Sequence, residues 1–84
     1  MTLQQQIRDF VTSNFYVADP NTLEDRTSLL DQGIIDSTGV LEVIMFIEST
    51  FGVTVEDSEM LPENLDSIER IAAFVARKQV AIAA

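Results

Sequence analysis

Apolar side chains recur at helical spacing in three segments of this 84-residue chain, at residues 3–14, 37–51 and 67–79. In the middle segment they form one stripe, whose members are Leu41, Ile44, Ile47 and Phe51, widened by Val40 and Val43. Amphipathic helices are stable when their apolar faces are buried against one another. The sequence therefore predicts an all-α fold built on three main helices.

Capping residues stand where each of these helices is expected to begin. Thr2 and Gln5 form a capping box at the first helix, and Asp66 and Glu69 form a second box at the last. Asp36 precedes the middle helix and is expected to be its N-cap, because its carboxylate accepts unpaired N–H groups and complements the helix dipole.

A fourth, short helix is expected at about residues 56–61, where Pro62 would halt it. Residues 16–36 contain Pro20 and a polar cluster, and they are expected to form a loop that packs against the helices. The length suits one small domain, residues 1–84. We predict a small four-helix bundle with a long loop between its first two helices.

The charge of the chain limits its partners. It has 14 acidic and 5 basic residues, a net charge of −9, and all the bases lie outside residues 27–69. Nucleic-acid phosphates repel such a chain, whereas its acidic middle favours basic surfaces on partner proteins. The apolar runs are too short to span a membrane, and the N-terminus lacks the features of a signal peptide. We expect a monomeric, cytoplasmic protein.

Ser37 is the first residue of the middle helix, and its hydroxyl is expected to face solvent. A helix N-terminus offers unpaired N–H groups and a partial positive charge, which suit a phosphate ester. The chain has no histidine or cysteine, and a serine hydrolase would need a base beside its nucleophile. We therefore predict that the chain is not an enzyme and that another enzyme modifies Ser37.

The expected loop ends in the run Gly33-Ile34-Ile35-Asp36-Ser37, which leads into the apolar middle helix. The pattern continues with Leu41, Val43, Ile44, Ile47 and Phe51 and with the acids Glu42 and Glu48. In these residues and in the order of its elements, the chain resembles the acyl carrier protein family over nearly its whole length. The resemblance implies an acyl-carrier-like bundle in which Ser37 carries 4′-phosphopantetheine from coenzyme A. It also implies that Asp36 contacts the transferase that attaches this arm.

Two residues after the serine bear on the subtype. Thr38 and Gly39 stand where fatty-acid members of the family usually have leucine and an acid, and the pattern is more similar to discrete D-alanyl carrier proteins. The resemblance therefore implies three kinds of partner: a phosphopantetheinyl transferase, an adenylate-forming ligase for acyl or aminoacyl groups, and a downstream acyltransferase or synthase.

Candidate partner contacts lie on or near the exposed face of the middle helix; they are Thr38, Glu42, Met45, Glu48 and Glu56. No metal site is predicted, because the acids near residue 57 lack the spacing of a calcium-binding loop. The alternative function is a helical interaction module that never receives an arm.

The cargo is left open by the sequence. Fatty acyl, aminoacyl, hydroxyacyl and polyketide groups all suit the same arm. A lipid chain has a candidate shelter in the core between the helices, near Val43, Phe46, Ile47 and Ile71. The alternative is that the bulky Phe46 ring fills this space.

Overall fold

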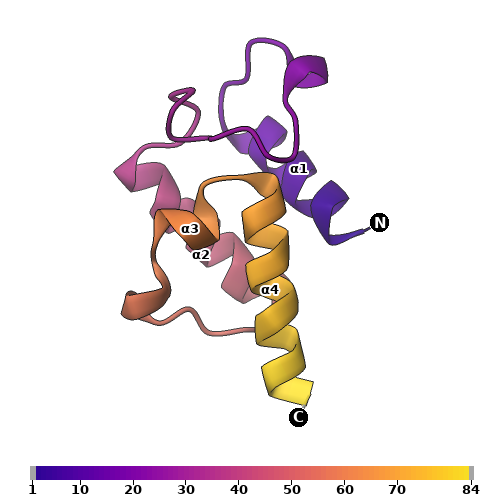
Figure 1. Cartoon of the computed structure of the whole chain (residues 1–84), viewed down its shortest axis with the longest axis vertical. Helices are drawn as coiled ribbons and strands as arrows, with labels where there is room; N and C mark the ends of the chain where they lie inside the picture. Colours follow the sequence, from indigo (N-terminus) through magenta and orange to yellow (C-terminus); the bar gives the residue numbers. More distant parts are fainter. Residues whose placement is uncertain (1, 84) are drawn as a thin grey trace.

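The computed structural model describes residues 2–83, and the side chains of residues 2–80. Its α-helices are α1 (Leu3–Asn14), α2 (Ser37–Phe51), α3 (Pro62–Leu65) and α4 (Ile68–Ala83), as labelled in Figure 1. Two short 3-10 turns, η1 (Pro20–Thr22) and η2 (Asp57–Glu59), lie in the connections. The part of the chain that the structure describes contains no strand, so the predicted all-α, acyl-carrier-like bundle is confirmed.

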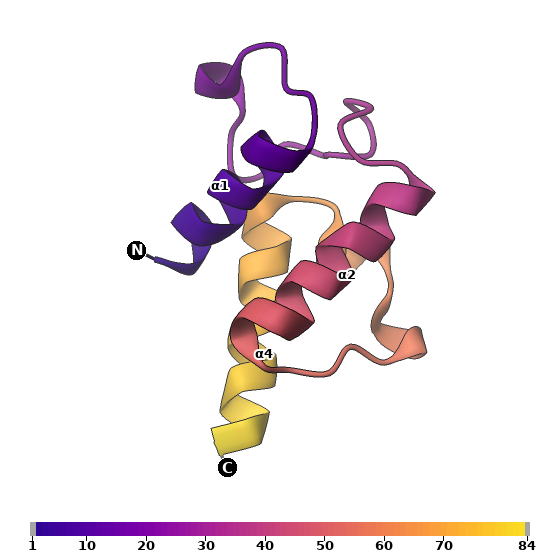
Figure 2. The ribbon, with the colours of Figure 1, turned by 180° about the vertical axis from the view of Figure 1, so that it is seen from behind.

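Helix α4 is the centre of the bundle and contacts α1, α2 and α3. In Figure 2, α2 crosses α4, and α1 lies beside the N-terminal half of α4. The inner faces supply most of the buried core: Ile7 and Val11 from α1, Val43, Ile44 and Ile47 from α2, and Ile68, Ile71, Ala72, Phe74 and Val75 from α4. The apolar residues that recur at helical spacing in the sequence thus form one shared core.

Four half-buried phenylalanines join α1 to α2. Phe10 stacks on Phe46 with ring centroids 4.1 Å apart, and Phe15 and Phe51 meet these two rings edge-on at 5.8 and 5.7 Å. Offset-stacked and edge-on pairs are the favourable geometries for aromatic rings. Phe46 is therefore engaged with α1, and it packs against the margin of the buried core.

The short helix predicted at about 56–61 is met only by a 3-10 turn, and the short α-helix lies farther along the chain. The chain forms η2 at Asp57–Glu59, and α3 begins at Pro62, the residue expected to end a helix. Proline is favoured in the first turn of a helix because its missing N–H has no intrahelical acceptor there and its φ angle already suits the helix.

The last helix begins at Ile68, within one residue of the predicted start, but its predicted cap is wrong. Ser67, which is buried, caps α4: its Oγ accepts a hydrogen bond from the Arg70 N–H at 3.0 Å. Asp66 is directed elsewhere, as described below. The helix also extends to Ala83, beyond the predicted residue 79, over an alanine-rich stretch that favours helix.

No helix among residues 2–83 is long and apolar enough to cross a membrane.

Candidate functional site

The loop before α2 is shaped around Leu29, which is fully buried. Its carbonyl accepts hydrogen bonds from the N–H groups of Ile34 (2.9 Å) and Ile35 (3.2 Å). This tight closure requires a left-handed residue at Gly33, whose φ of 68° is readily adopted only by glycine. The closed loop sets the position of the residues that follow it, Asp36 and Ser37.

Asp66 ties this loop to the α3–α4 junction. Its carboxylate accepts hydrogen bonds from the Ser28 hydroxyl at 2.7 Å and from the Leu30 N–H at 2.9 Å, and its carbonyl accepts the Leu29 N–H at 2.7 Å. The sequence pattern predicted that this carboxylate caps the last helix. Its real partners lie 36 and 38 residues away, so local sequence contained no signal for them.

Asp36 is the N-cap of α2, as predicted. Its Oδ1 accepts the Gly39 N–H at 2.7 Å. Gly39 is buried, and a Cβ at this position would lie 2.9 Å from Cε1 of Phe15. The glycine thus allows the end of α1 to pack directly on the first turn of α2.

Ser37 is exposed, and no described residue forms a hydrogen bond with its hydroxyl. Beside it lies an apolar hollow of about 300 Å³, whose other lining residues are Leu30, Val40, Met60, Leu61, Pro62 and Leu65. A hydroxyl at a helix start, open to solvent and next to an apolar surface, can accept a phosphoryl group without disturbing the fold.

The exposed face of α2 contains Thr38, Glu42 and Met45, as the helical spacing indicated. It also contains Leu41, which is 55% exposed and was wrongly assigned to the core. At about 100° per residue, Leu41 lies roughly 110° from the centre of the buried stripe, so the helix turns it away from the core.

Two of the predicted partner contacts have internal hydrogen bonds. Glu48 is half-buried, and its carboxylate accepts the Val55 N–H at 3.0 Å, which anchors the chain after α2. Glu56 is exposed at the start of η2, and its N–H donates to the Glu59 carboxylate at 2.9 Å.

Glu59 also ties this segment to α4. Lys78 donates to its carboxylate at 2.8 Å, and this bond, followed by that from the Glu56 N–H, holds the pKa of the Glu59 carboxyl below its ordinary value. The segment that borders the hollow beside Ser37 is therefore held to α4 by an ion pair. No group of side chains that could hold a metal ion occurs among the residues described.

Comparison with known proteins decides the family. A family model described as the phosphopantetheine attachment site matches residues 5–75. The chain belongs to the acyl carrier protein family. The D-alanyl carrier protein of Streptococcus uberis is 30% identical over 79 residues, which cover 94% of this chain and 98% of that protein.

Two further relatives agree. The D-alanyl carrier protein of Abiotrophia defectiva is 31% identical over 55 residues, 66% of this chain and 70% of that protein. The acyl carrier protein of Campylobacter hominis is 29% identical over 75 residues, 89% of this chain and 91% of that protein. The chain is thus a carrier of acyl or aminoacyl groups, closer to the D-alanyl type.

Members of this family bear a covalently attached 4′-phosphopantetheine, and they interact with a phosphopantetheinyl transferase and with biosynthetic enzymes. The residues at the start of α2 fit such a group, because the exposed Ser37 hydroxyl has no internal partner and adjoins an open apolar hollow. When bound, the group supplies the thiol that this cysteine-free chain lacks.

Proposed function

We propose that Ser37 is the residue that carries the 4′-phosphopantetheine arm. The observation that supports this most is the environment of its hydroxyl: it is exposed, has no described hydrogen-bond partner and stands at the first residue of α2. The neighbouring hydroxyl of Thr38 lies one residue farther into the helix and does not border the apolar hollow.

The attachment transfers a phosphoryl group from coenzyme A. The Ser37 oxygen attacks the β-phosphorus, forms the new phosphoester bond and displaces 3′,5′-ADP, while the hydroxyl proton passes to a base. The base and the metal belong to the transferase, because the Ser37 hydroxyl has no described hydrogen-bond partner that could take its proton. Asp36 keeps its carboxylate on the Gly39 N–H and thereby holds the first turn of α2 in place during this step.

We propose further that the chain has no catalytic activity of its own and receives its cargo from an adenylate-forming ligase. Two of the relatives are named D-alanyl carrier protein, which supports an aminoacyl cargo. A downstream acyltransferase or synthase then takes the cargo. Monomeric state and cytoplasmic location stay predictions.

The partner surface is proposed on the exposed face of α2. Leu41 and Met45 supply apolar contact on it and Glu42 supplies charge, with Thr38 at the end next to Ser37. Glu56 extends the acidic part of this surface, whereas Glu48 contributes at its margin because its carboxylate also holds Val55. Contacts between exposed charges are weak and salt-sensitive, which suits a shuttle that must release each partner.

The test is the intact mass of the chain after incubation with coenzyme A, Mg²⁺ and a broad-specificity phosphopantetheinyl transferase. We expect a gain of one phosphopantetheinyl group. Ser37→Ala abolishes the gain, whereas Thr38→Ala, which removes the adjacent hydroxyl, keeps it.

Circular dichroism shows whether each variant is folded. An unmodified mass for the folded wild-type chain, with a transferase that loads another carrier in parallel, would contradict the proposal. It would favour the alternative function, an interaction module without an arm.

A further inference from the structure

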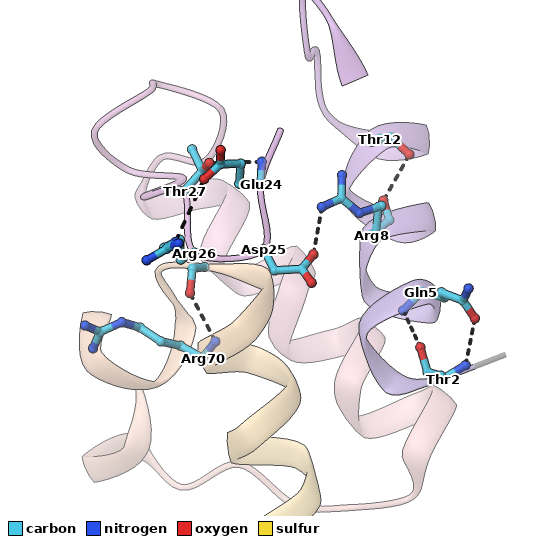
Figure 3. A network of polar contacts seen from close by, with 10 residues as sticks. Thr2, Gln5, Arg8, Thr12, Glu24, Asp25, Arg26, Thr27 and Arg70 are labelled. Atoms are coloured by element: carbon cyan, nitrogen blue, oxygen red, sulfur yellow. Dashed lines mark hydrogen bonds and ion pairs between the residues drawn. The ribbon is translucent and has the colours of Figure 1, made fainter. Parts of the chain in front are cut away.

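The basic residues of the chain fall into two groups. Arg8 pairs with Asp25 at 2.7 Å, as Figure 3 shows, and Lys78 pairs with Glu59 at 2.8 Å. The other three, Arg26, Arg70 and Arg77, border a single hollow of about 500 Å³, together with Glu63, Ser67, Glu69 and Ala73. In a chain with a net charge of −9, this gathering of arginines is a local exception.

The shape of this hollow follows from α4. Arg70, Ala73 and Arg77 are spaced three and four residues apart and therefore share one face of the helix. Ala73 is small and exposed, so it leaves an open floor between the two arginines. Arg26 comes from the loop before α2, and Figure 3 shows its side chain pointing to the same side of the molecule as that of Arg70.

The charges of these arginines are only weakly neutralised within the molecule. Arg70 donates to the carbonyl of Glu63 at 3.2 Å and Arg77 to the Asn64 amide oxygen at 3.0 Å, and both acceptors are uncharged. Arg26 lies 3.9 Å from Glu24, a pair whose side chains are mostly exposed. An exposed ion pair of this kind contributes little to stability.

The two acids that border the hollow, Glu63 and Glu69, do not neutralise these guanidinium groups. Among the side chains described, neither Glu63 nor Glu69 forms an ion pair with the three arginines. The two bonds to uncharged acceptors hold the guanidinium groups of Arg70 and Arg77 in place, while most of their donors stay available.

We propose that this hollow, the arginine groove, binds an acidic, extended segment of a partner protein. Guanidinium groups bind carboxylates through paired hydrogen bonds. Two turns of α4 separate Arg70 from Arg77 by about 10 Å, the length of about three extended residues, so a peptide with several carboxylates fits better than a single small anion. The net charge of the chain does not prevent this, because at physiological ionic strength charges more than about 8 Å apart are largely screened.

The arginine groove shares no lining residue with the hollow beside Ser37. A partner segment bound there leaves Ser37 and the exposed face of α2 accessible to a second enzyme. The proposal is therefore independent of whether Ser37 carries an arm, and it is tested separately.

The experiment is an NMR titration of the full ¹⁵N-labelled chain with a hexaglutamate peptide at about 0.1 M salt, where the Debye length is about 10 Å. We expect saturable shifts at Arg26, Ser67, Arg70, Ala73 and Arg77. The variant Arg70→Gln/Arg77→Gln is expected to bind the peptide at least about tenfold more weakly, since it loses two charge-assisted contacts.

A matched control makes the same change in net charge on another helix, away from the arginine groove. Gln4→Glu/Ser13→Glu adds two negative charges on the exposed surface of α1 and is expected to change the affinity by less than about twofold. Both variants are compared with the wild type by circular dichroism to confirm that they are folded.

Four results would overturn the proposal. The first is the absence of shifts with the peptide, and the second is equal binding of the peptide by the arginine variant and the wild type. The other two would each show a different occupant of the arginine groove. Inorganic phosphate producing the same shifts at the same concentration of charge would indicate a simple anion site. The same shifts on raising the chain concentration without peptide would indicate a second copy in the arginine groove.

Discussion

Asp36 and Ser37 are adjacent, yet their side chains meet different surroundings. Asp36 has a structural role, because its carboxylate accepts the Gly39 N–H of the first turn of α2. Ser37 makes no described side-chain hydrogen bond and faces solvent. At the scale of single residues, the helix cap and the proposed attachment site are therefore different neighbours, and substitutions can separate their effects.

Asp36→Ala is expected to lower the free energy of unfolding by about 0.5–2 kcal/mol, the usual cost of removing a helix N-cap. Ser37→Ala is expected to change it by less than about 0.5 kcal/mol, as for other surface substitutions without a structural role. Urea unfolding followed by circular dichroism measures both. A larger loss in Ser37→Ala than in Asp36→Ala would mean that the serine, rather than the aspartate, caps α2.

At the scale of elements, α2 presents three surfaces. Val43 and Ile47 face the central core, Phe46 faces α1 through its stack on Phe10, and Leu41 and Met45 face solvent. Helical spacing alone correctly placed Met45 outside and Ile47 inside. It failed for Leu41, a member of the predicted stripe, because the described structure places no element over that side of the helix.

Glu42→Lys tests the exposed face of α2 as a partner surface. Reversing one exposed charge is expected to reduce kcat/KM of the transferase for this chain about fivefold, equivalent to about 1 kcal/mol. The difference should shrink as salt is raised, because exposed charges are screened.

Asp9→Lys, the same reversal at an exposed position of α1, is the matched control and is expected to have less than about a twofold effect. Equal losses in the two variants would show that total charge, and not the face of α2, governs the encounter.

At the scale of the whole molecule, the long loop is ordered by distant contacts. Asp66 holds Ser28 and Leu30, Asp25 accepts the Glu69 N–H at 2.8 Å through its carbonyl, and the Asp25 carboxylate pairs with Arg8 of α1. The loop therefore connects α1 to the start of α4, and its closure positions Ser37.

Asp66→Ala is expected to lower the free energy of unfolding by about 1.5–3 kcal/mol, because charge-assisted hydrogen bonds to the loop are lost. Amide hydrogen exchange at Leu30, Ile34 and Ile35 should become faster, since their loop is no longer tied to the α3–α4 junction. Asp31→Ala removes an exposed carboxylate of the same loop and is expected to stay within about 0.5 kcal/mol of the wild type. Unchanged exchange in Asp66→Ala would show that the loop closes without this anchor.

The sequence by itself determined the features that depend on neighbouring residues. The spacing of apolar side chains predicted α1 and α2 at their observed bounds, and the Thr2–Gln5 capping box and the Asp36 cap were recognisable because each is satisfied within a few residues. The same local order, with Ser37 at the start of α2, was sufficient to indicate the carrier family.

Only the tertiary structure decided which partner each remaining polar group takes. Asp66 had a plausible local role as a cap, but it binds a loop more than 30 residues away, and Ser67 caps α4 instead. Pro62 starts a helix where it was expected to stop one, and Arg26 of the loop before α2 borders one groove with Arg70 and Arg77 of α4. The physical reason is common to these cases: a side chain with both local and distant partners is placed by the packing of the whole chain, which local spacing does not encode.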